Sequence, residues 1–77
     1  MKDIYVKLVA ISDVQEFVAA VNSINGEIDL ISGRYTVDGK SILGIFSLDL
    51  SKPIKVTSDN ADYNELVAKL GKFIVEG

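Results

Sequence analysis

The side chains that could carry chemistry in this sequence are hydroxyls, carboxylates and lysines, because its 77 residues include no histidine and no cysteine. Disulfides and thiol chemistry are thereby excluded. The acidic residues Asp59, Asp62 and Glu65 could be mistaken for a metal cluster, but they lack the ligand spacing of a known ion-binding loop. At the start of a helix, such carboxylates favourably oppose the helix dipole instead. We therefore predict no metal ion, no cofactor and no catalytic residue.

The sequence also gives little reason to expect a bound phosphate or a polyanionic partner. Its glycines fall at separate turns rather than at the spacing of a phosphate-binding loop: Gly26, Gly33 and Gly39. Three of its lysines are expected on the solvated surface: Lys40, Lys52 and Lys55. The net charge of −3 and the isoelectric point near 4.7 argue against nucleic acid and against an anionic membrane as partner.

Ser41 opens the most apolar stretch of the chain, in which six of the nine residues from 42 to 50 are large and hydrophobic. A serine before such a run is a favourable helix N-cap, since its hydroxyl accepts a hydrogen bond from the first free amides. A helix over about residues 42–48 places Ile42, Ile45 and Phe46 on one face, while Leu43 projects elsewhere. A short helix buries only one face, so an exposed remainder would indicate a protein partner. The alternative is that these side chains pack in the core, as we expect for Ile45, Leu48 and Leu50.

The hydrophobic patterns predict the elements that position this segment. Strands are expected over about residues 3–9, 27–31, 34–37 and 54–58, with a tight turn at Ser32–Gly33. The residues Ser12–Gln15 form a capping box for a first helix that ends at Asn25–Gly26. A last helix begins at Asp59–Asn60 and carries an apolar stripe that reaches Phe73 and Ile74. The order β-α-β-β-α-β-α predicts a two-layer α+β sandwich.

We expect a single domain over residues 1–77, of a size that buries roughly 60% of the surface of its unfolded chain. No segment has the length of a membrane span or the pattern of a signal peptide. We therefore predict a cytoplasmic protein that does not insert into a membrane.

With this order of elements, the chain resembles HPr, the histidine-containing phosphocarrier of the bacterial sugar phosphotransferase system. The strongest local match is residues 40–50, which look like the family's regulatory-serine segment: a Lys-Ser, then hydrophobic residues, a glycine and a Ser-Leu pair. The segment from Lys52 through Val56 into the last helix also fits. The resemblance covers essentially the whole chain, and it implies an open-faced sandwich with three helices on one face of a four-stranded antiparallel sheet.

The family's phosphoryl-transfer motif has no counterpart in this sequence. HPr proteins carry Gly-Xaa-His-Ala-Arg-Pro-Ala at the start of the first helix, where this shorter loop places Ala10 near the histidine position and Ser12 near the arginine position. Transfer requires a nitrogen nucleophile and a cation beside the phosphate. Ser12 could form only a low-energy ester, and Asp13 would repel the incoming anion. We therefore predict neither a phosphocarrier driven by phosphoenolpyruvate nor an enzyme.

The resemblance further implies roles for the helix after Ser41. In HPr of the Gram-positive type, the matching serine is phosphorylated by an ATP-dependent HPr kinase, which makes Ser41 the candidate regulatory site, with a plain N-cap as the alternative. Ile42, Leu43 and Phe46 match the hydrophobic residues with which HPr proteins dock Enzyme I, sugar permease domains and the kinase. Lys40 completes the predicted partner-binding set.

The leading prediction is therefore an HPr-like, histidine-lacking module that binds a protein partner through its second helix. A first alternative is a working phosphocarrier with an unusual acceptor, such as Ser12 or Asp13. A second alternative is a structural module that forms a homo-oligomer through its hydrophobic segment. The sequence leaves the oligomeric state open.

Overall fold

The strands and helices follow one another in the predicted order. The computed structural model describes residues 3–59 and 61–76. Its elements are β1 (Ile4–Val6), α1 (Ile11–Asn22), β2 (Asp29–Ser32), β3 (Tyr35–Asp38), α2 (Ile42–Phe46), β4 (Ile54–Thr57), α3 (Tyr63–Leu70), a 3-10 turn η1 (Gly71–Phe73) and β5 (Ile74–Val75). All strand pairs are antiparallel, in the order β3-β2-β4-β1-β5. The α+β architecture is confirmed, but the sheet has five strands rather than four.

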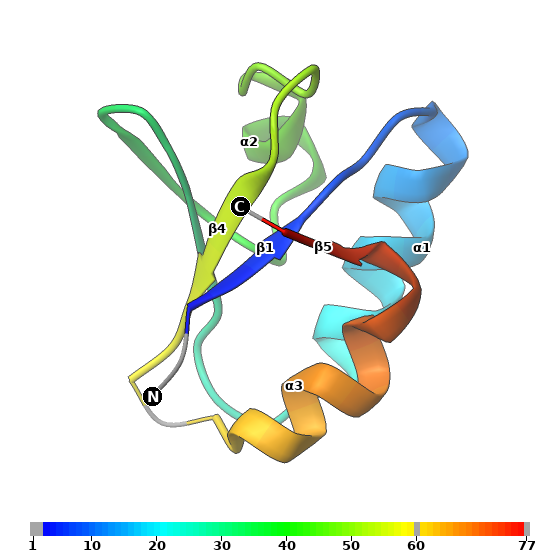
Figure 1. Cartoon of the computed structure of the whole chain (residues 1–77), viewed down its shortest axis with the longest axis vertical. Helices are drawn as coiled ribbons and strands as arrows, with labels where there is room; N and C mark the ends of the chain where they lie inside the picture. The colour runs from blue at the N-terminus through cyan, green and yellow to red at the C-terminus, as the bar shows by residue number, and fades with distance from the viewer. Residues whose placement is uncertain (1–2, 60, 77) are drawn as a thin grey trace.

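One face of the sheet is covered by helices, and the other is open. Figure 1 shows α1 and α3 together on one side of the sheet. Alternate residues of the central strands point to that side, so Ile4, Val6 and Ile54 are buried. Between them, Tyr5 and Lys55 lie opposite each other in the β1–β4 register and are only partly covered. The period-two pattern of these strands therefore determines which face meets the helices.

The core between the two layers is wholly apolar. Within the described residues, no polar or charged side chain is buried. At its centre, the rings of Phe17 in α1 and Phe73 in η1 meet edge to face, with centroids 5.7 Å apart and planes at 76°. The buried set comprises Ile4, Val6, Leu8, Val14, Phe17, Val21, Ile24, Ile28, Leu30, Ile45, Leu48, Ile54, Val56, Leu66, Leu70 and Phe73.

The turn of the β2–β3 hairpin lies one residue later than predicted. Ser32 pairs with Tyr35, so the two turn residues are Gly33 and Arg34. Gly33 has a φ of +61°, and a positive φ at the first of two turn residues is the requirement of a type II′ turn. This turn leaves both Arg34 and Tyr35 exposed.

The end of the last helix differs most from the prediction. Asn60 in its predicted start lies outside the described residues, and α3 begins at Tyr63 with Asp62 in the N-cap position. It ends at Leu70, before Gly71, which has a low helix propensity. The chain then makes the turn η1, and Ile74–Val75 pairs with β1 as the fifth strand. The predicted apolar stripe was therefore wrong at its end, where it joined two different elements.

Candidate functional site

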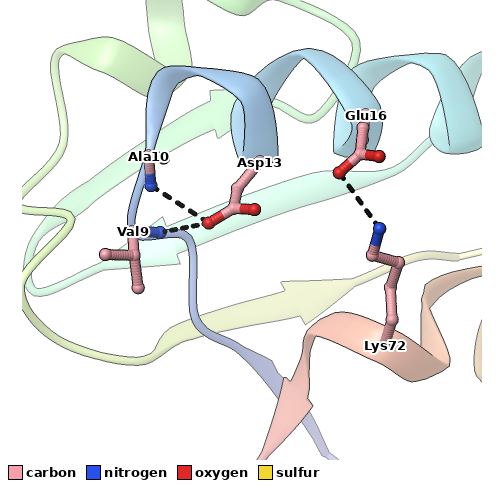
Figure 2. A network of polar contacts seen from close by, with 5 residues as sticks. All are labelled: Val9, Ala10, Asp13, Glu16 and Lys72. Atoms are coloured by element: carbon pink, nitrogen blue, oxygen red, sulfur yellow. Dashed lines mark hydrogen bonds and ion pairs between the residues drawn. The ribbon is translucent and has the colours of Figure 1, made fainter.

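Asp13, rather than Ser12, caps the first helix (Figure 2). The Asp13 carboxylate accepts hydrogen bonds from the backbone amides of Val9 and Ala10, each with an N–O distance of 3.0 Å. Ala10 occupies the N-cap position, and its methyl side chain provides no acceptor. Ser12 is exposed within the helix, so the predicted capping box Ser12–Gln15 was wrong. In a capping box, the side chain at N3 accepts a hydrogen bond from the backbone amide of the N-cap residue. Asp13 forms this bond with Ala10, although Ala10 has no side-chain acceptor to form the reciprocal one.

This arrangement fixes a negative charge at the start of α1. The hydrogen bond from the Ala10 amide makes the largest contribution to lowering the pKa of Asp13, and the bond from the Val9 amide makes the next largest. The nearby Lys72 lowers this pKa by a smaller amount. Lys72 is itself paired with Glu16 at 3.0 Å, as Figure 2 shows. A charged carboxylate thus holds the amides of Val9 and Ala10 in the loop before α1. An incoming anion meets electrostatic repulsion there.

Acid should release this cap in a defined pH range. Because hydrogen bonding holds the pKa of Asp13 below the ordinary aspartate value of 3.8, its stabilising contribution is complete above pH 3.8 and is lost as pH falls through the lower, folded pKa. The amide proton shifts of Val9 and Ala10 should therefore stay constant at neutral pH and move together in a transition below 3.8. An NMR pH titration measures this. The transition should vanish in Asp13→Asn, and its persistence there would contradict the assignment.

Ser41 forms the N-cap that the sequence predicts for α2. Its Oγ accepts a hydrogen bond from the Gly44 amide at 3.1 Å, and the side chain is half-buried. The backbone approaches closely at this point, since a β-carbon on Gly44 would lie 3.2 Å from Ser41 Oγ and 3.3 Å from Val37 Cβ. A glycine in the first turn thus lets the serine hydroxyl reach its amide.

Removing the Ser41 hydroxyl should destabilise the domain modestly. Ser41→Ala loses the acceptor for the Gly44 amide, and loss of an N-cap costs about 1 kcal/mol. Ser41→Asp keeps an acceptor at the same position, and aspartate is as good a cap as serine. Chemical denaturation of both variants measures the difference. Equal stability of Ser41→Ala and the parent chain would show that the cap contributes nothing.

The α2 segment divides into buried and exposed residues, and Leu43 is exposed as predicted, but Phe46 is exposed although the helical spacing placed it on the face of Ile42 and Ile45. Ile45 is fully buried, and Ile42 is half-buried against the core. Leu43 is 81% exposed and Phe46 is 40% exposed. Lys40 is also exposed, and its Nζ donates to the Gly26 carbonyl at 3.3 Å. We call Lys40, Ile42, Leu43 and Phe46 the α2 surface.

Two further exposed hydrophobic residues lie at the start of α1. Val9 is 76% exposed and Ile11 is 67% exposed. α1 and α2 are in contact, and Figure 1 shows the start of α1 and the whole of α2 at the same end of the molecule. Neither residue was among the predicted site residues, because Val9 falls at the end of the strand predicted over residues 3–9. The sequence carries no signal that separates them from core residues, because Leu8–Ile11 is apolar throughout and Leu8 is fully buried.

The antiparallel sheet, the three helices and the serine that caps α2 define an HPr-like open-faced α+β sandwich. A family model described as the PTS HPr component phosphorylation site matches residues 13–76. The match covers most of the chain, and the chain belongs to the HPr family. No curated protein matches the chain. Within residues 3–59 and 61–76, no helix has the length and apolar character needed to cross a membrane.

Proposed function

We propose that this HPr-family chain is a protein-binding module that docks through the α2 surface and does not carry phosphate on histidine. The exposure of Leu43 and Phe46 supports this most directly, because both are large apolar side chains held in solvent on a short helix. Clustered exposed hydrophobic residues are a common mark of a protein interface. Two further exposed apolar residues, Val9 and Ile11, stand at the start of α1, a helix that contacts α2.

The chemistry at the start of α1 supports the loss of the carrier role. The sequence contains no histidine. A phosphoramidate requires a nitrogen nucleophile, whereas Ser12 offers only a hydroxyl oxygen. The Asp13 carboxylate is already engaged with two backbone amides and repels an incoming phosphate. A phosphocarrier with an acceptor at Ser12 or Asp13 is thus the less favoured function.

We further propose that Ser41 is the regulatory phosphorylation site. Phosphorylation would replace its hydroxyl with a group of charge about −2, at the position where Oγ now accepts from the Gly44 amide. That charge would stand beside Leu43 and would change which partner the α2 surface accepts. We take the partner to be a cytoplasmic protein, such as an HPr kinase, Enzyme I or a permease-like domain.

The test is to weigh the intact protein after incubation with ATP and HPr kinase, and separately with phosphoenolpyruvate and Enzyme I. We expect one phosphate from the kinase, none in Ser41→Ala, and one again in the matched control Ser47→Ala. Phosphate transferred from phosphoenolpyruvate would overturn the loss of the carrier role. Phosphate in neither reaction would remove the regulatory role of Ser41. If sedimentation showed an oligomer whose population rises with protein concentration, the result would favour the alternative of a structural module that forms a homo-oligomer.

A further inference from the structure

A groove separate from the α2 surface lies between the turn of the β2–β3 hairpin and the segment that joins α2 to β4. Its volume is about 590 Å³. The hairpin contributes residues 32–35 to the lining, and the connection contributes residues 47–49 and 52. Figure 1 shows the tip of the hairpin and this connection at the same end of the molecule. Sites for small organic ligands have volumes of roughly 300–1,000 Å³.

The charged groups in this groove favour an anion. Arg34, the only arginine in the sequence, lines one side, and Lys52 lines the other. Across residues 3–59 and 61–76, neither of them forms an ion pair. The carboxylate in the lining, Asp49, accepts hydrogen bonds from the hydroxyl and the amide of Ser51 at 2.5 and 3.0 Å. Asp49 keeps its negative charge in spite of these bonds and interacts with Lys52, so the lining carries two positive charges and one negative charge. The groove is therefore positive in sum, in a chain of net charge −3.

The remaining lining adds a place for a ring. Tyr35 follows Arg34 and is 67% exposed, although aromatic side chains are normally far more covered. Leu48 lies buried at the base of the groove. A forked guanidinium matches the oxygens of a phosphate in a bidentate arrangement, and an aromatic face stacks on a planar ring.

We propose that this groove binds a small organic phosphate with a planar ring, of the nucleoside monophosphate type. Arg34 and Lys52 hold the phosphate from the two sides, and the Tyr35 ring packs against the base. This site goes beyond the docking function, because none of its lining residues belongs to the α2 surface. Lys52 was predicted to lie on the solvated surface, and here we assign it a role in binding the phosphate.

The test is an NMR titration of the 15N-labelled chain with AMP, with adenosine and with inorganic phosphate. AMP should produce saturable shifts confined to the amides of the groove, and each of the other two probes should bind more weakly. Arg34→Gln removes charge-assisted hydrogen bonds and should weaken AMP binding about tenfold or more. Lys69→Gln removes an exposed lysine of α3 and should leave AMP binding unchanged. Tyr35→Leu should weaken binding of AMP but not of phosphate.

Three results would overturn this proposal. They are the absence of saturable shifts, shifts spread over the lysines of the whole surface, and an equal AMP affinity of Arg34→Gln and the parent chain. Because Arg34 is exposed at a turn, its variant should retain the dispersed spectrum of the folded protein. The variant Leu43→Glu should bind AMP as the parent chain does, which separates this site from the docking function.

Discussion

Replacing Phe17 by alanine is expected to lower the free energy of unfolding by about 3–5 kcal/mol. The Phe17 side chain is completely buried and meets Phe73 edge to face. Its removal opens a cavity between the two layers and withdraws the aromatic contact that joins α1 to η1. Domains of this kind are stable by about 5–15 kcal/mol, so the loss is a large fraction of the total. Urea denaturation followed by circular dichroism measures it.

Leu43→Ala is the matched control, because it also truncates a large apolar residue on a helix. Leu43 is 81% exposed, and substitutions at such surface positions usually change stability by less than about 0.5 kcal/mol. If Phe17→Ala were as stable as Leu43→Ala, Phe17 could not be the centre of the core. If Leu43→Ala were the less stable variant, Leu43 would be a core residue and the α2 surface would be misplaced.

The double substitution Leu43→Glu with Phe46→Glu should abolish binding through the α2 surface. Apolar anchors at the centre of an interface contribute about 2 kcal/mol or more each, and here each is replaced by a charge that must be desolvated. With HPr kinase and Enzyme I as the proteins titrated, calorimetry should show a loss of roughly 700-fold or more in affinity for whichever of them binds the parent chain.

The control for this experiment is Val67→Glu, which places the same charge on an exposed apolar residue of α3. Val67 is 38% exposed, close to the 40% of Phe46, but it lies on a different helix. We expect Val67→Glu to bind as the parent chain does and both variants to remain folded. Undiminished binding by the double variant would place the interface elsewhere on the molecule.

The order of strands and helices followed from periodicity, because β1 and β4 bury alternate residues and α1 and α3 each bury one stripe. The pattern failed at two helix ends, for a local reason at the start of α1 and for a tertiary reason at the end of α3. Ser12–Gln15 and the acid Asp13 both offer a capping pattern, and spacing alone does not rank two registers that differ by two residues. The apolar spacing of Leu70, Phe73 and Ile74 fits a continued helix as well as a turn followed by a strand. Pairing with β1 decided the matter, and that pairing is tertiary.

The α2 segment was more predictable than the start of α1. Ser41 caps through an amide three residues away, and the exposure of Leu43 follows from the angle of its side chain on a short helix. The exposure of Val9 and Ile11 depends on how α1 meets the sheet, which no local pattern encodes. The groove between Arg34 and Lys52 likewise joins segments that only the folded chain brings together.

The position of β1 in the sheet has a consequence for how the chain folds during its synthesis. Among the described strands, β1 pairs with β4 and β5. Ile4 can therefore pair only after Val56 has been synthesised, and the pairing of Val6 with Ile74 comes later still. By contrast, β2 and β3 form a local hairpin that closes as soon as it is made. Non-local pairing of this kind slows folding and leaves apolar strands open in the meantime. β1, which is synthesised before the other four strands of the sheet, is therefore among the last to find its neighbours.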